Sequence, residues 1–294
     1  MKFGAIDIGT NAARLLVGEV EVLGNHSFVK KISYTRVPLR LGDEVFENGI
    51  ISTKKATDFS KTIQAFSLIA ETFNVKKLRA VATSAMREAI NAKEVIAQIK
   101  KESGVTIEVI SGDEEAKLIF GTFFLLDFDK TAPFIVIDVG GGSTEISVFE
   151  NGTRIASKSF QVGTIRLLKE KVATTIWSEI HEWIIQHVDL NSPHKLFGTG
   201  GNINKVHKMI GKSQSATLDT YAIIKLRDKL DKLSLEERTD KYQLKPDRAD
   251  VIVPAMNIYL YILNELSCTQ ITVPKIGLSD GMIYAMHKEY IASL

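Results

Sequence analysis

The sequence is poor in cysteine and in long apolar runs. Its 294 residues include one cysteine, Cys268, which excludes an intramolecular disulfide and a cysteine-rich zinc site and fits a reducing compartment. The apolar runs near residues 123–126 and 134–136 are far too short to span a bilayer. The N-terminus, with Asp7 inside its first apolar stretch, lacks a secretory pattern. We therefore expect a cytoplasmic protein without a membrane partner.

The sequence also lacks an excess of charge of either sign. Lys and Arg number 37 against 35 Asp and Glu, which gives a net charge of +2. Such a balance shows no general attraction to nucleic acid, so a nucleic-acid partner is not expected. Hydrophobic residues make up 45% and charged residues 24%, which is the usage of an ordinary globular protein. The length suffices for two domains.

Apolar periodicity and turn signals occur in two rounds along the chain. The first round predicts strands at residues 2–8, 14–22, 28–36, 78–83 and 105–110, and helices that begin at Ser52 or Thr53, at Asn91 and at Glu114. The second round predicts strands at 134–138, 146–149, 153–160 and 195–197, with helical segments over 164–186 and after residue 201. Turn signals at Gly24-Asn25 and Asn151-Gly152 separate neighbouring strands. This order predicts an α/β protein in which mixed sheets are covered by helices.

A weak internal repeat opens each round. Residues 6–11 read IDIGTN and residues 137–144 read IDVGGGST, so Asp7 and Asp138 lie 131 positions apart at the ends of apolar strands. Glycines let backbone N–H groups approach an anion, Ser and Thr add hydroxyl donors, and the Asp can hold a hydrated magnesium ion. A single turn of this kind is more often an ordinary hairpin. Two copies, each opening a domain-sized half, favour a pair of turns that hold a phosphate chain between two domains.

Further motifs carry a family resemblance. The paired turns, with a third glycine turn GTGG at 198–201, resemble the actin-like superfamily of sugar kinases, heat-shock ATPases and actin. The whole chain is similar to the exopolyphosphatase and guanosine pentaphosphate phosphohydrolase family, through ATSAMREA at 82–89, ISGDEEA at 110–116, DVGGGSTE at 138–145, RAD at 248–250 and GLSDG at 277–281. The resemblance implies two actin-like (ribonuclease H-like) domains, 1–128 and 129–294, with the active site in the cleft between them. It allows the last helix to pack back on the first domain, and it is compatible with a homodimer.

The same resemblance implies magnesium-dependent hydrolysis of a terminal phosphoanhydride bond, in inorganic polyphosphate or in guanosine pentaphosphate. It places the catalytic base that activates water at Glu115. A general base in this reaction must orient and deprotonate a water in line with the terminal phosphorus. The alternative is that Asp113, Glu114 and Glu115 are acids of a first helical turn, where the helix dipole favours them. We assign catalysis to Glu115 and the dipole role to Glu114.

The remaining site residues follow the motifs. Asp138 and Glu145 are expected to hold the metal and orient water, with Asp7 as a further metal ligand and Arg87 as a catalytic, phosphate-binding fork. The alternative for Arg87 is a salt bridge to a nearby acid. The expected phosphate-binding residues are Thr10, Asn11, Thr83, Ser84, Gly140, Gly141, Gly142, Ser143 and Thr144, with Arg40 a weaker candidate. Ala12 and Ser279 replace residues that are usual in the family, a serine and an arginine, and affect substrate choice more than reaction type.

Two other functions stay open. An actin-like kinase would need a nucleotide pocket and an acceptor, and the residues between Gly198 and Met209 do not identify a purine pocket. A non-catalytic sensor of polyphosphate or of nucleotide alarmones would not need Glu115. Phosphate release from polyphosphate without any nucleotide distinguishes the hydrolase from both.

Overall fold

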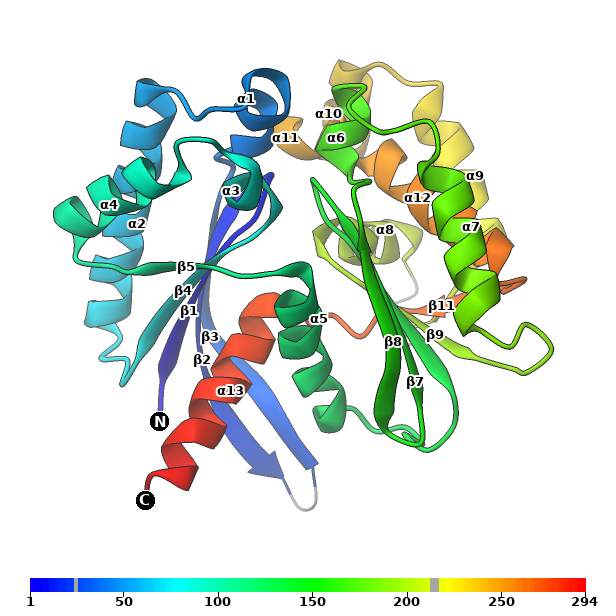
Figure 1. Cartoon of the computed structure of the whole chain (residues 1–294), viewed down its shortest axis with the longest axis horizontal. Helices are drawn as coiled ribbons and strands as arrows, with labels where there is room; N and C mark the ends of the chain where they lie inside the picture. Colours follow the sequence, from blue (N-terminus) through cyan, green and yellow to red (C-terminus); the bar gives the residue numbers. More distant parts are fainter. Residues whose placement is uncertain (24–25, 212–216) are drawn as a thin grey trace. The chain divides into compact units, whose positions relative to one another are not determined.

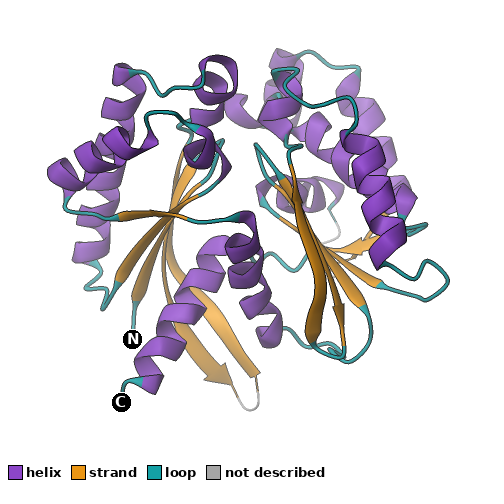
Figure 2. Cartoon of the chain, viewed as in Figure 1, coloured by secondary structure: helices purple, strands orange, loops and turns teal. Residues whose placement is uncertain are grey.

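The computed structural model describes residues 1–23, 26–211 and 217–294 and divides the chain into two units. Unit 1 comprises Met1–Asp127 together with Ile276–Leu294, and unit 2 comprises Phe128–Lys275. In each unit a mixed sheet carries helices on its faces (Figure 2). Residues 276–294, which the sequence placed in the second domain with a last helix able to pack back, therefore group with unit 1.

Unit 1 is built on a five-stranded sheet in the order β3-β2-β1-β4-β5 (Figure 1). β1, β2 and β3 pair antiparallel, whereas β4 and β5 run parallel to β1. The strands are β1 (Phe3–Ile8), β2 (Ala13–Leu23), β3 (His26–Val37), β4 (Leu78–Ala82) and β5 (Ile107–Val109). The helices are α1 (Leu41–Asn48), α2 (Thr53–Thr72), α3 (Ser84–Glu88), α4 (Ala92–Ser103), α5 (Gly112–Gly121), the 3₁₀ turn η1 (Thr122–Leu125) and α13 (Leu278–Ala292).

Unit 2 is built on a six-stranded sheet in the order β10-β11-β9-β6-β7-β8. Its strands are β6 (Phe134–Val139), β7 (Thr144–Glu150), β8 (Thr153–Phe160), β9 (Lys195–Thr199), β10 (Thr217–Asp219) and β11 (Gln270–Thr272). Its helices are α6 (Thr164–Leu168), α7 (Ile176–His187), α8 (Gly201–Ile210), α9 (Thr220–Asp231), α10 (Leu235–Tyr242), α11 (Pro246–Ala249) and α12 (Ile252–Glu265).

The two sheets share one topology. The order β3-β2-β1-β4-β5 of unit 1 recurs in unit 2 as β8-β7-β6-β9-β11, with β10 added at the edge. In both, the first strand sits between an antiparallel partner and a parallel one. The repeat seen in the sequence therefore extends to the whole fold of each unit, and the predicted α/β fold class, with mixed sheets covered by helices, is confirmed.

Local signals explain most of the element boundaries. Ser52 caps α2 by accepting a 3.2 Å hydrogen bond from the N–H of Lys55, as its position predicts. Asn91 does not cap α4 with its side chain, contrary to prediction, because that amide exchanges hydrogen bonds of 3.0 and 2.8 Å with the backbone of Ile51. The helix predicted to begin at Glu114 starts two residues earlier, at Gly112, ends at Gly121 and is followed by the 3₁₀ turn η1.

Two predicted turns have different outcomes. Asn151 and Gly152 both adopt positive φ, 50° and 69°, as a two-residue hairpin turn between β7 and β8 requires. The turn expected at Gly24-Asn25 lies outside the described residues. Among the helices that the structure describes, none combines the length and the apolar character needed to cross a membrane.

Candidate active site

A hydrogen bond closes the turn after β1, and two of its backbone N–H groups point in the same direction. The N–H of Gly9 donates to the carbonyl of Ala12 at 3.1 Å. The carbonyls of Thr10 and Asn11 accept hydrogen bonds of 3.0 and 2.9 Å from the backbone at the start of α1. In a trans peptide the N–H points opposite to the C=O, and the described residues contain no cis bond. The N–H groups of Asn11 and Ala12 therefore point away from α1.

The turn after β6 repeats this construction with one more glycine. The N–H of Gly140 donates to the carbonyl of Ser143 at 2.9 Å. The carbonyls of Gly140 and Gly141 accept hydrogen bonds of 3.1 and 2.8 Å from the first turn of α6, and the Gly142 carbonyl accepts 2.8 Å from Nε of Arg166. By the same peptide geometry, the N–H groups of residues 141, 142 and 143 point away from α6. Three successive amides on one side form a concavity suited to an anion.

A pair of carboxylates lies at the foot of this second turn. Asp138 on β6 and Glu145 on β7 are directly opposite in the antiparallel register, and one oxygen of each lies within 4.8 Å of the other. Glu145 is 4% exposed and accepts hydrogen bonds from the hydroxyls of Ser143 (2.7 Å) and Ser159 (2.6 Å). Like charges placed opposite each other across two strands repel. Oxygen donors at this spacing suit a magnesium ion, which would offset that repulsion.

The equivalent pair in unit 1 has a different character. Asp7 lies opposite Arg14 in the β1–β2 register, just as Asp138 lies opposite Glu145. The two side chains form a 2.7 Å ion pair, with Asp7 6% exposed. Arg14 neutralises the charge of Asp7, as a bound cation would neutralise the charge of Asp138. Asp7 thus has a cationic cross-strand partner, whereas Asp138 has a second carboxylate as its cross-strand partner.

The third glycine turn, between β9 and α8, closes against Asp138. Gly200 has a φ of +106°, and a Cβ built there would lie 2.9 Å from Oδ1 of Asp138. The hydroxyl of Tyr259, from α12, is fully buried, donates to the carbonyl of Thr199 and accepts a 3.3 Å hydrogen bond from the N–H of Val139. Burial, followed by the nearby charge of Asp138, raises the pKa of Tyr259 well above its ordinary value. The phenol therefore stays protonated and joins the ends of β6 and β9.

In unit 1, α5 presents Glu115 to an arginine. Ser111 caps the helix by accepting a 3.1 Å hydrogen bond from the N–H of Glu114, which sets its first turn. The carboxylate of Glu115 lies 3.5 Å from Nη1 of Arg87, and the same nitrogen donates to the carbonyl of Ile110 at 2.8 Å. The salt bridge weighed as the alternative for Arg87 therefore exists, and its acid is the expected catalytic residue.

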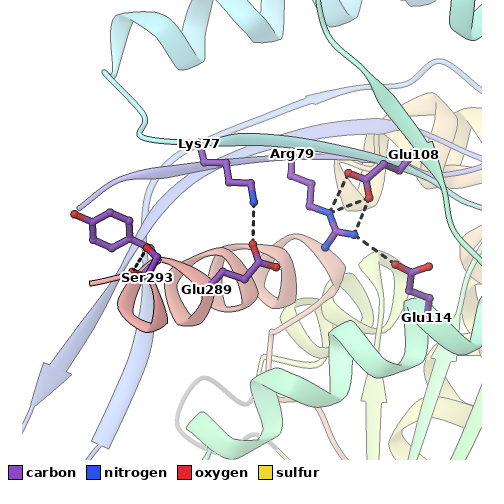
Figure 3. A network of polar contacts seen from close by, with 7 residues as sticks. Lys77, Arg79, Glu108, Glu114, Glu289 and Ser293 are labelled. Carbon is purple, nitrogen blue, oxygen red and sulfur yellow. Dashed lines mark hydrogen bonds and ion pairs between the residues drawn. The ribbon is translucent and has the colours of Figure 1, made fainter.

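The neighbouring Glu114 points elsewhere. Its carboxylate lies 3.4 Å from the guanidinium of Arg79, which also pairs with Glu108 at 2.8 Å (Figure 3). Its side chain is 47% exposed, against 13% for Glu115. The two adjacent glutamates thus have separate partners, and Glu114 is the natural control for any test of Glu115.

Other predicted phosphate ligands have local partners. Thr83 and Ser84 are buried at the start of α3, where the Ser84 hydroxyl lies 3.2 Å from the carboxylate of Glu88. The Thr144 hydroxyl is fully buried and donates to a backbone carbonyl ahead of α6 at 2.6 Å. Arg40 forms a 2.6 Å ion pair with Asp43 in the next turn. The contacts of Thr144 and Arg40 serve local structure.

Comparison with known proteins identifies the family. The model of the Ppx/GppA phosphatase family matches residues 20–290. The chain belongs to this family. The predicted membership is confirmed.

Individual relatives cover nearly the whole chain. "Exopolyphosphatase 1" of Mycobacterium tuberculosis is 25% identical over 303 residues, which cover 96% of this chain and 87% of that protein. A crystal structure of an exopolyphosphatase from Cytophaga hutchinsonii aligns with a TM-score of 0.83 at 24% identity, covering 98% of each chain. The Aquifex aeolicus family member aligns with a TM-score of 0.75 at 22% identity, covering 99% of this chain and 98% of that one. The two structures show that this Ppx/GppA phosphatase shares their fold.

The structure of this Ppx/GppA phosphatase adds residues that sequence reasoning missed. A Cβ on Gly163 would lie 2.5 Å from the backbone of Gly141 and Gly142, so only glycine lets α6 approach the glycine turn after β6 this closely. Arg166 and Tyr259 hold the glycine turns from more than 20 residues away in sequence. A glycine before Thr164 is a weak helix-start signal, and nothing local marks the arginine or the tyrosine.

Proposed function

We propose that this protein is an exopolyphosphatase, which releases the terminal phosphate of inorganic polyphosphate by hydrolysis. The observation that carries the proposal is the row of amides at residues 141–143, directly beside the carboxylate pair of Asp138 and Glu145. A phosphate chain needs donors for its oxygens and a cation for its charge, and unit 2 supplies both kinds of group within one turn. The relatives that carry the name exopolyphosphatase match the chain almost end to end, which supports the same substrate class.

In this proposal the backbone amides of both turns bind phosphate oxygens. Those at residues 141–143 stabilise the charge that develops on the reacting phosphate, because they are held in place before substrate arrives. The amides of Asn11 and Ala12 and the guanidinium of Arg87 are the proposed phosphate-binding groups of unit 1.

Glu115 is the proposed general base. Its carboxylate takes a proton from water as the water oxygen bonds to the terminal phosphorus. The bond from that phosphorus to the bridging oxygen breaks, and the bridging oxygen stays with the shortened chain. The guanidinium of Arg87 lies 3.5 Å from this carboxylate, so the proposed base has a cationic partner beside it.

We place magnesium on Asp138 and Glu145. Bound there, it would offset the charge of the phosphate oxygens. Asp7 is left out of this ligand set because Arg14 is paired with it. Magnesium binding by calorimetry tests the assignment without reference to activity. Asp138→Asn should weaken magnesium binding at least about 10-fold, whereas Asp240→Asn, on exposed α10 of the same unit, should not. Equal binding by both variants would exclude this ligand set.

The reaction itself is tested by phosphate release from polyphosphate in the absence of nucleotide. Release supports the hydrolase, whereas a kinase or a sensor would give none. Guanosine pentaphosphate offered as a competing substrate gives the ratio of kcat/KM values and so ranks the two substrates.

The base is tested by two adjacent variants. Glu115→Gln keeps size and hydrogen bonding but removes basicity, so kcat should fall by about 10²- to 10⁴-fold. Polyphosphate binding should be kept, because a negative charge near an anion has been removed. Glu114→Gln should leave kcat unchanged, because its partner Arg79 belongs to a surface network. If Glu115→Gln retains full turnover, the base is another residue, and Glu145 is the next candidate.

A further inference from the structure

The GLSDG segment at residues 277–281 has no part in the proposed chemistry, yet it begins the last helix of unit 1. That helix, α13, contacts β1, β2, β3, α5 and η1. In Figure 1 it runs alongside α5, the helix that carries Glu115. A segment from the end of the sequence thus supports an element from the middle of unit 1.

The first turn of α13 is fixed in place by Asp280. Its carboxylate accepts a 3.1 Å hydrogen bond from the N–H of Gly277 and lies 3.0 Å from Nζ of Lys31 on β3. Asp280 is 5% exposed, so its carboxylate is largely removed from water and depends on these two partners. Asp280 therefore anchors the first turn of α13 to the sheet of unit 1.

The crossing of α13 and α5 is closer than any side chain would permit. A Cβ on Gly281 would lie 2.1 Å from the carbonyl oxygen of Leu118 and 3.3 Å from the N–H nitrogen of Ile119. Gly281 is within a helix and has no positive φ, so backbone conformation does not require glycine here. The requirement comes from the approach of the two helices, one turn along α5 from Glu115.

We propose that Gly281 is a positioning residue for the catalytic base: by allowing α13 to touch the backbone of α5, it sets where α5 holds the Glu115 carboxylate. The inference rests on the proposed role of Glu115. In the Gly281→Ala variant, the distance between the new Cβ and the Leu118 carbonyl oxygen would have to increase from 2.1 Å to at least 3.0 Å, a shift of roughly 1 Å. A misplacement of about 1 Å can cost about 10²-fold in rate.

Helix propensity makes the opposite prediction, which sharpens the test. Alanine is a better helix former than glycine, so propensity alone predicts that Gly281→Ala stabilises α13. The matched control is Gly277→Ala, because Gly277 has an extended φ of −167° and a Cβ there meets no atom within 4 Å. Both changes add one methyl group within the same motif, and only one of them meets α5.

The kinetic test measures kcat and equilibrium polyphosphate binding separately. Gly281→Ala should lower kcat by about 10²-fold with the Kd for polyphosphate within about twofold, and Gly277→Ala should match the wild type. Because Gly281 acts through Glu115, the double variant Glu115→Gln/Gly281→Ala should be no slower than Glu115→Gln alone. A further loss equal to that of the single Gly281→Ala change would overturn the inference.

Amide hydrogen exchange on α5 separates this inference from the proposed function. Gly281→Ala should speed exchange in α5 relative to Gly277→Ala, whatever the reaction is. Unchanged exchange overturns the contact. Full activity of Glu115→Gln would instead show that Glu115 is not the general base, and the contact between Gly281 and α5 would then have no catalytic role.

A second variant guards against loss of folding. Tyr284 of α13 faces Gly121 at the far end of α5, where a Cβ on the glycine would lie 3.9 Å from the ring. Tyr284→Ala loosens the same helix pair without adding an atom, and it should lower kcat and speed α5 exchange in the same direction as Gly281→Ala. If it changes neither, the inference is wrong.

Discussion

The hydroxyl of Tyr259 is the best single probe of how unit 2 holds its glycine turns in place. Tyr259→Phe removes one oxygen and little volume from a residue that is 1% exposed. It deletes the hydrogen bond to the carbonyl of Thr199 and leaves the buried N–H of Val139 without its 3.3 Å partner. No water can replace the hydroxyl in a site this buried without opening the core.

The expected magnitude follows from these groups. Leaving a buried donor unsatisfied costs about 1–3 kcal/mol, and a lost hydrogen bond about 0.5–1.5 kcal/mol. We therefore expect the free energy of unfolding to fall by about 2–3 kcal/mol. With a urea m-value of about 1–3 kcal/mol/M, the unfolding midpoint should fall by about 0.7–3 M. kcat/KM should fall as well, because Val139 and Thr199 flank Asp138.

Urea unfolding followed by circular dichroism measures the effect. Tyr261→Phe is the matched control: it lies two residues away on α12, and its hydroxyl donates to the carbonyl of Trp177 at 2.8 Å in a partly exposed position where water can take over. The control should lose less than about 1 kcal/mol. Equal losses in the two variants would refute the reasoning that burial at Tyr259 decides the cost.

The pH dependence gives an independent check of the same hydroxyl. The pKa of Tyr259 is raised in the folded state, so above its ordinary value of 10.0 the unfolded chain binds fewer protons than the folded one. The free energy of unfolding of the wild type should therefore fall as pH rises above about 10. Tyr259→Phe lacks this group, so the difference between the two proteins should shrink in that range. A constant difference would contradict the assigned pKa direction.

Two further changes test the proposed phosphate-binding groups. Gly163→Ala places a methyl group 2.5 Å from the Gly141–Gly142 peptide, so the turn must shift by about 0.5 Å or more. In a protein that still folds, kcat/KM should fall by about 10- to 10²-fold. Unchanged kinetics would mean that the turn amides do not bind the substrate. Arg87→Lys keeps the charge but removes the planar guanidinium, whose Nη1 contacts both the Ile110 carbonyl and Glu115. Loss of one charge-assisted hydrogen bond, about 1.5–3 kcal/mol, predicts a fall in kcat/KM of about 10- to 10²-fold. Wild-type kinetics would assign Arg87 a structural role only.

The sequence alone predicted the fold class because the signals for it are local. Apolar residues three and four apart from Ala56 onward, with a serine ahead of them, are enough to mark α2. The repeat of strand, Asp and glycine turn at Asp7 and Asp138 was readable because both copies are contiguous segments. The family motifs are contiguous as well, so the resemblance needed no structure.

Local signals fail where a residue's partner is distant. The repeat treats Asp7 and Asp138 alike, and only the register of the sheets shows that one faces Arg14 and the other Glu145. The side chain of Asn91, a good helix cap by type, is taken by Ile51 instead. In each case a cross-strand or cross-loop partner outweighs the preference of the local segment.

The groups that hold the site in place were decided by tertiary structure. Tyr259 joins two strand ends from a helix 120 residues beyond Val139, and Gly281 meets α5 from the last helix of the chain. Neither residue type carries a signal of its own, because a buried tyrosine or a helical glycine fits many roles. What each does depends on which backbone lies against it, and that is set by the packing of segments far apart in the sequence.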